Sequence, residues 1–209
     1  MYSVKLMKPL LNVKEEIISL KNSETTKKLL LKVLLLSLIG AILTALTVYF
    51  SSDLEMQIRK TGETDIEKYK LITSAVTGIL GLFIPIVTIT LFTIFSWIFF
   101  QELSFKKLFI VQTYSYVIGV VGQLGQVLIM FSLGVDSLYS PFGLASLSQS
   151  LFDSKYINSL MNCFTIFSVW SVVFQIISLK YLSTRSKKNI ITVVILLNAV
   201  SWILLAAWS

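Results

Sequence analysis

Residues 116–131 read YVIGVVGQLGQVLIMF, an apolar run that contains three glycines and two glutamines. The glycines are Gly119, Gly122 and Gly125, and the glutamines are Gln123 and Gln126. In water, glycine disfavours a helix and an unpaired buried amide costs free energy. In a bilayer the backbone has no alternative to a helix, small residues let helices approach closely, and amides bond between helices. The stretch therefore predicts a transmembrane helix inside a bundle.

The composition of the whole chain agrees with a membrane protein. Of its 209 residues, 55% are hydrophobic and 14% are charged, whereas soluble domains carry about 25% charged residues. The net charge of +7 is divided among short segments between apolar runs, which favours membrane topology over nucleic acid as its explanation. The chain has no His and one Cys, Cys163, so we expect no metal centre, no cofactor and no internal disulfide.

Five apolar runs are long enough to cross a hydrocarbon core of about 30 Å as helices. We predict an all-α, polytopic bundle of five transmembrane helices over residues 29–209, preceded by a cytoplasmic amphipathic tail over residues 1–28. No cleavable signal peptide is expected, because a polar tail precedes the first run. The runs are Leu29–Phe50, Leu71–Phe100, Leu108–Leu133, Met161–Leu182 and Ile190–Trp208.

Lys and Arg between the runs predict the orientation. Thirteen of the eighteen lie in the tail or in the loops after the second and fourth runs, and five lie in the other two loops. The positive-inside rule then places the N-terminus in the cytoplasm and the C-terminus outside. We expect a multi-pass protein of a cell membrane, the inner (plasma) membrane of a bacterium.

Two segments outside the runs are predicted to lie on the membrane surface. In MKPLLNVKEEIISLK, Pro9 suits the first helical position, and Leu10, Val13, Ile17 and Leu20 recur at helical spacing. In SLYSPFGLASLSQSLF, Ser140 and Pro141 suit the start of a second helix, on the outer surface.

Polar residues form stripes along the apolar runs. In the third run, Gln112, Tyr116, Gly119, Gln123 and Gln126 advance by alternating steps of four and three residues, which places them on one helix face. Three readings stay open: polar contacts between helices, a polar cavity that admits a substrate, and a seam between copies of the chain. Gly119, Gly122, Gly125 and Gly81 are predicted to lie at close helix contacts, with Gly122 against the fourth helix, and Pro85 to kink the second run. The candidate polar residues are Gln112, Tyr116, Gln123, Gln126, Ser168, Ser171, Gln175 and Asn198.

The middle of every run lacks Asp, Glu, Arg and His, and Lys32 lies near a run end. Proton relays and ion-coupled pumps place such groups at membrane depth, so the sequence disfavours a proton-coupled transporter. It also contains no Walker loop, GxSxG elbow or HExxH pair. We therefore expect no enzyme and no catalytic residues.

Four stretches resemble the Yip family of five-span membrane proteins, named for interaction with Ypt/Rab GTPases, and specifically its bacterial branch. They are MKPLLNVKEEI, QELSFKKLFIVQTYSYV, SPFGLASL and FTIFSVWSVVFQIISLKYL, the last containing Trp170. The resemblance implies a five-helix bundle, a non-enzymatic role and membrane-protein partners.

Two functions are consistent with these features. The first is a membrane scaffold or accessory subunit, in an export or envelope-stress complex, whose partners are the lipid bilayer and other membrane proteins or a second copy. The alternative is a channel or facilitator for a small polar or amphipathic solute or lipid. The alternative requires a cavity lined by Gln123, Gln126 and Gln175, because amides facing such a solute would not all be paired within the bundle.

Overall fold

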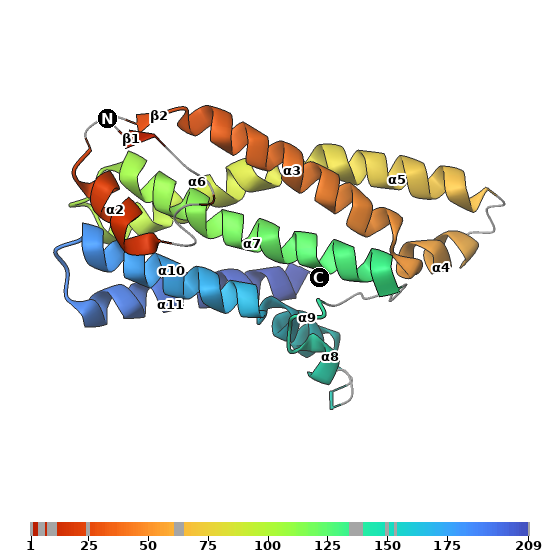
Figure 1. Cartoon of the computed structure of the whole chain (residues 1–209). Helices are drawn as coiled ribbons and strands as arrows, with labels where there is room; N and C mark the ends of the chain where they lie inside the picture. Colours follow the sequence, from red (N-terminus) through yellow and green to blue (C-terminus); the bar gives the residue numbers. More distant parts are fainter. Residues whose placement is uncertain are drawn as a thin grey trace.

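The chain folds into an elongated bundle of helices (Figure 1). The structure is a computed structural model and describes residues 2–3, 7, 12–23, 26–60, 65–133, 140–148, 151–152 and 154–208. A short parallel pairing joins β1 (Tyr2–Ser3) to β2 (Thr26–Lys27). The helices are α2 (Val13–Lys21), α3 (Leu29–Tyr49), α4 (Ser52–Lys60), α5 (Ile66–Gly81), α6 (Ile84–Phe99), α7 (Phe105–Leu133), α8 (Ala145–Ser148), α9 (Lys155–Cys163), α10 (Ile166–Leu182) and α11 (Lys187–Trp208).

Four helical stretches among the described residues are long and apolar enough to cross a membrane: α3, the α5–α6 pair, α7 and α11. They leave many large apolar side chains exposed, as expected where lipid is the surrounding solvent. The chain is therefore a multi-pass membrane protein. The fourth predicted run is shorter than expected, because the helix breaks at Phe164 and Thr165 and leaves α10 with 17 residues.

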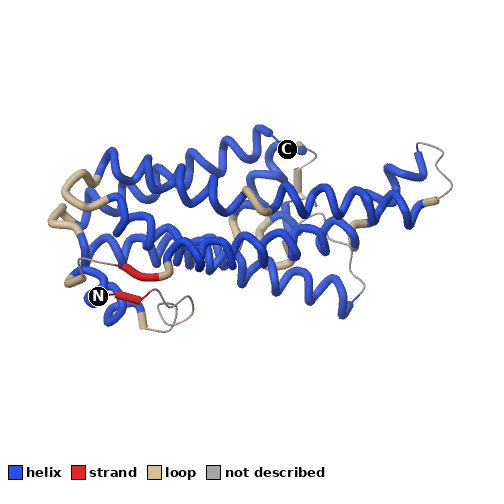
Figure 2. The backbone as a smooth tube through the Cα atoms, turned by 90° about the horizontal axis from the view of Figure 1, so that it is seen from above, coloured by secondary structure: helices blue, strands red, loops and turns tan. Residues whose placement is uncertain are grey.

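Helix α7 is the central helix of the bundle (Figure 1). It contacts α3, α6 and α10, whereas α3 and α5 form the most extensive helix pair. The long helices run along a common direction when the bundle is seen from above (Figure 2). Different faces of α7 therefore contact different helices.

The second predicted run consists of two helices. Helix α5 ends at Gly81, Leu82 and Phe83 form a turn, and α6 begins at Ile84 with Pro85 in its first turn. Proline lacks a backbone N–H and is tolerated in a first turn, where that donor has no partner. The expected kink is thus a break just before Pro85.

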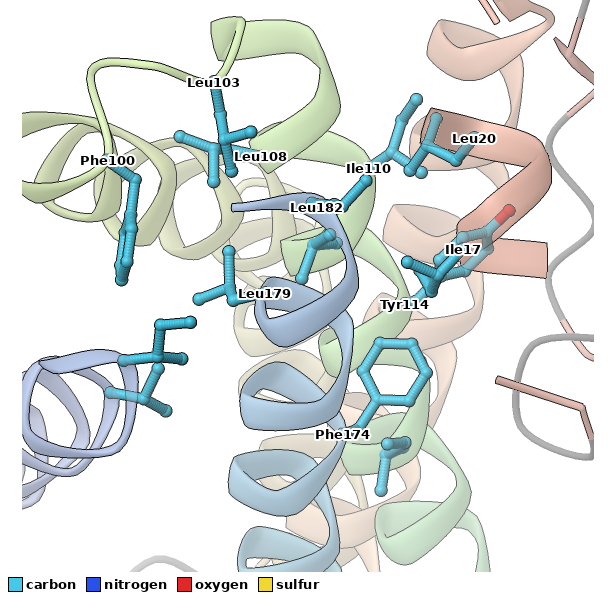
Figure 3. Packing of buried hydrophobic residues seen from close by; sticks show 14 residues of the cluster. Ile17, Leu20, Phe100, Leu103, Leu108, Ile110, Tyr114, Phe174, Leu179 and Leu182 are labelled. Atoms are coloured by element: carbon cyan, nitrogen blue, oxygen red, sulfur yellow. The ribbon is translucent and has the colours of Figure 1, made fainter. Parts of the chain in front are cut away.

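Helix α2 packs against the bundle. Ile17 and Leu20 are fully buried with Tyr114, Phe174 and Leu182 (Figure 3), and Lys107 Nζ donates to the Lys21 carbonyl at 2.8 Å. This corrects the prediction that the apolar face of this helix lies on the membrane surface. Pro9 and Leu10, also assigned to this helix, lie outside the described residues.

The segment between α7 and α10 contains two short helices. Ser140 and Pro141 lie in a turn, and α8 begins only at Ala145, which corrects the predicted helix start at Pro141. Helix α9 was not predicted, although Ser154 caps it by accepting a hydrogen bond from the Ile157 N–H. Its polar first turn lies just before an apolar run, so hydropathy alone gives little sign of a separate helix.

Candidate polar cavity between four helices

A cavity of about 370 Å³ lies among α6, α7, α10 and α11 and is partly open to its surroundings. All eight candidate polar residues line it. From α7 they are Gln112, Tyr116, Gln123 and Gln126, from α10 they are Ser168, Ser171 and Gln175, and from α11 it is Asn198. The stripes of three separate helices therefore face one shared space.

The spacing of the α7 residues explains why they meet there. Steps of four and three residues advance close to one full turn of 3.6, so Gln112, Tyr116, Gly119, Gln123 and Gln126 occupy one side of the helix. The opposite side carries apolar residues such as Ile110 and Ile118, which are fully buried in the main core cluster. Packing of that apolar side fixes the rotation of α7 and turns its polar side toward the cavity.

A hydrogen-bonded chain joins three helices at the deep end of the cavity. The Ser115 and Ser171 hydroxyls are in contact at 2.5 Å, and Gln175 Nε2 donates to Ser115 Oγ at 2.7 Å. Asn198 Nδ2 donates to Gln175 Oε1 at 3.3 Å and to the Val194 carbonyl at 2.8 Å. This part of the stripe holds α7, α10 and α11 together.

Gln112 joins the cavity to α6. Its Nε2 donates to Ser96 Oγ at 3.0 Å, and both side chains are buried. Beyond it, toward the end of the bundle that carries α2, Leu108, Leu179 and Leu182 fill the space between the helices. The polar space is therefore closed on this side by packed apolar side chains.

The other half of the cavity has fewer internal bonds. Gln123 Nε2 donates to Thr44 Oγ1 of α3 at 3.3 Å. Gln126 and the Tyr116 hydroxyl make no side-chain hydrogen bond within the described part of the chain. Their donors and acceptors border the cavity, where a polar guest or water could satisfy them.

The glycines of α7 have different environments. A Cβ at Gly119 would meet no atom within 4 Å, so this residue borders open cavity, which corrects its assignment to a close helix contact. A Cβ at Gly122 would lie 2.7 Å from the ring of Phe167 in α10, and one at Gly125 would lie 3.1 Å from the ring of Phe142. These two glycines make room for aromatic side chains, whose rings meet edge to face at 5.2 Å.

Gly81 lies at a contact between helix backbones. A Cβ there would come within 3.2 Å of Ala41 Cα and 3.3 Å of Thr44 Cβ in α3. Small residues on both helices allow this approach, the arrangement that stabilises helix pairs in lipid. Gly81 therefore acts in the α3–α5 pair, away from the polar cavity.

The structure adds lining residues that the sequence analysis did not select. They are chiefly Asn162, Thr165 and Trp202. Thr165 forms a capping box with Ser168 at the start of α10, and Asn162 Oδ1 accepts from the Ser140 N–H at 2.8 Å. The Thr165-to-Ser168 spacing is a helix-start signal within an apolar run, and it could have identified this end of the cavity.

The chemistry of the lining is neutral. Among the described residues that line the cavity, none carries a charge; the polar groups are amides, hydroxyls and the Trp202 indole. Such a surface can donate and accept hydrogen bonds, but it offers no counter-ion to a charged guest. No protein-family model matches the chain, and no curated protein or solved structure matches it.

Proposed function

We propose that this protein binds a small, uncharged, hydrogen-bonding solute in the cavity and facilitates its passage across the membrane. The observation that supports this proposal is the meeting of eight polar side chains from three helices around one space of about 370 Å³. Side chains that served only to join helices would leave no such space between them, because protein interiors pack closely.

The charge state of the solute follows from the lining. Moving a charged group into a low-dielectric site is strongly unfavourable unless a partner is present, and the described lining residues supply none. A polyol or an amide, in contrast, can exchange its hydrogen bonds with water for bonds to Gln126, Tyr116 and neighbouring groups.

The closed end of the cavity favours a gated facilitator over an open pore. Leu108, Leu179 and Leu182 fill the bundle beyond Gln112, so continuous passage requires those side chains to separate. Local rearrangement of packed helices is a common route for such opening.

We further propose five membrane crossings, with the N-terminus in the cytoplasm. Helix α10 has 17 residues, and at 1.5 Å per residue it reaches about 26 Å, slightly less than the hydrocarbon core. The charge distribution between the apolar runs supports this orientation.

Solute flux into proteoliposomes tests the proposal. Vesicles with the full chain should take up glycerol or urea faster than protein-free vesicles, by stopped-flow light scattering. Gly119→Trp should fill the space beside Gly119 and reduce the protein-dependent flux at least about tenfold, equivalent to a barrier increase of about 1.4 kcal/mol. Leu128→Trp, on an exposed position of the same helix, is the matched control and should retain the flux.

Two results would contradict the proposal. One is a wild-type flux of both solutes equal to that of empty vesicles. The other is a Gly119→Trp protein that is folded and inserted yet transports as fast as wild type, because the cavity would then have no part in the movement.

A second candidate function, a membrane scaffold with protein partners, is favoured by a different feature. Leu151, Phe152 and Tyr156 expose large apolar surfaces around the start of α9, outside the long apolar helices. The resemblance to the Yip family also favours this role. Replacing Phe152 and Tyr156 with Ser should abolish photo-crosslinks formed from this segment in native membranes if the surface binds a partner, and should leave the cavity-dependent flux unchanged.

A further inference from the structure

A second hollow lies on the outside of the bundle, at the end that carries α2. It is a groove of about 440 Å³ between the start of α3, the first turn of α6 and the start of α7. Its walls include Lys28, Leu30 and Leu34 from α3 and its cap, Ile86 from α6, and Lys106 and Phe109 from α7. Among the described residues, none lines both this groove and the polar cavity.

The charge of the groove is concentrated at one end. Lys28 precedes the first residue of α3 and Lys106 is the second residue of α7, and both side chains are exposed. Within the described part of the chain, neither lysine forms an ion pair, and no acidic residue lines the groove. Two lysines with no acidic partner among the described residues therefore border the same opening, so the groove is complementary to a negative group.

The remainder of the groove is apolar and accessible from the lipid. Leu30 and Leu34 are one helical turn apart on α3, and they are 77% and 50% exposed. Ile86 is the third residue of α6, which begins near the middle of the bundle beside Gly40 of α3. The groove thus extends from the lysines at the helix ends toward the bundle centre, in the direction that an acyl chain takes through a leaflet.

We propose that this groove binds one anionic phospholipid. The phosphate and the negative headgroup lie between Lys28 and Lys106, and an acyl chain follows Leu30, Leu34 and Ile86. Each basic residue near an anionic surface contributes attraction for the headgroup, and the apolar wall contributes through contact with the chain. A zwitterionic lipid would use the same wall but would gain less from the two lysines.

Native mass spectrometry of the full chain in detergent tests the assignment. Phosphatidylglycerol and phosphatidylcholine with the same acyl chains are titrated against wild type, Lys28→Gln/Lys106→Gln and the control Lys68→Gln/Lys155→Gln. The control removes the same charge from two exposed lysines in the first turns of α5 and α9. Neutralising the groove pair should weaken phosphatidylglycerol binding roughly 25-fold, about fivefold per lysine, and should leave the control near wild type.

The titration decides whether the lipid is held at the groove, elsewhere on the surface, or by its phosphate alone. Equal binding of phosphatidylglycerol by wild type and the groove variant, or equal loss in both double variants, would overturn the assignment. Glycerol phosphate is added last as a competitor. If it displaces phosphatidylglycerol at a similar concentration, the groove is a simple anion site, and the assignment to a phospholipid is overturned. A preference for phosphatidylglycerol that only the groove variant loses, without competition by glycerol phosphate, supports it.

Discussion

Gly122 of α7 packs so closely against Phe167 of α10 that a Cβ on the glycine would lie 2.7 Å from Phe167 Cδ2. Gly119, one turn earlier on the same helix, would place its Cβ in open space with no atom within 4 Å. Two glycines in one stretch therefore have opposite roles: one allows a ring to pack and the other leaves room in the cavity.

Replacing Gly122 with Leu should destabilise the protein. The new side chain must displace the Phe167 ring, which also packs against Phe142, and overpacking of this kind typically costs about 1–3 kcal/mol. The melting temperature in detergent should fall. Gly119→Leu is the matched control and should melt close to wild type, because its side chain enters empty space. A silent Gly122→Leu would mean that Phe167 does not cover this position.

The Gln175 bridge should contribute modestly to stability. Gln175→Leu removes a hydrogen bond to Ser115 and one from Asn198, and such bonds between membrane helices average about 0.6 kcal/mol each. We expect a loss of about 1 kcal/mol in the free energy of unfolding in mixed micelles. A double-mutant cycle of Gln175→Leu with Asn198→Leu should give a coupling of about 0.6 kcal/mol.

The control for this cycle pairs Asn198→Leu with Gln123→Leu. The amide of Gln123 bonds to Thr44 on α3 and not to Asn198, so these two changes should add within about 0.5 kcal/mol. If the Gln175 and Asn198 changes are equally additive, the amides do not act as one bridge.

The carboxyl of Glu102, at the end of the bundle that carries α2, should make the stability of the protein depend on pH. Partial burial raises the pKa of its carboxyl. The hydrogen bond from Ser183, a hydrogen bond from its own backbone and the nearby Arg185 guanidinium together outweigh burial and place the pKa below its ordinary value of 4.5. A lowered folded-state pKa gives stability that is present above the ordinary value and is lost as pH falls through the folded value.

The melting temperature of wild type should therefore decrease below about pH 4.5, and Glu102→Gln should show a smaller decrease over the same interval. The side chain of Glu102 is 27% exposed, so solvent screening limits the difference. Identical pH profiles for the two proteins would show that the link between the α6–α7 and α10–α11 loops does not depend on the charge of Glu102.

The polar stripes were predictable from the sequence because helix periodicity determines which side chains share a face. Gln112, Tyr116, Gln123 and Gln126 follow that period, and the structure places them around one cavity with Gln175. Periodicity does not tell what lies opposite a face. The sequence therefore does not reveal the empty space beside Gly119 or the ring of Phe167 against Gly122, since both depend on how the helices pack.

Other parts were not predictable for related physical reasons. The sequence pattern of the apolar face of α2 is the same whether that face contacts lipid or protein. Only the folded structure shows that Ile17 packs in the core. The break at Phe164 and Thr165 is concealed by the hydropathy of its surroundings. There the informative signal is local hydrogen bonding, since Thr165 and Ser168 cap α10 reciprocally.

Cysteine labelling in intact cells tests the proposed orientation. Ser154 caps the start of α9, the short helix before α10, and Lys187 begins α11, the helix after α10; both residues are exposed. In Figure 1, α9 lies beside the end of α10 that is away from the α10–α11 loop. The positive-inside rule places Lys187 in the cytoplasm. In a Cys163→Ser background, Ser154→Cys should react with an impermeant maleimide in intact cells, whereas Lys187→Cys should react only after permeabilisation.

Reaction of Lys187→Cys alone would reverse the orientation. Equal reaction of both in intact cells would show that α10 does not cross the membrane, because its two ends would then lie on the same side.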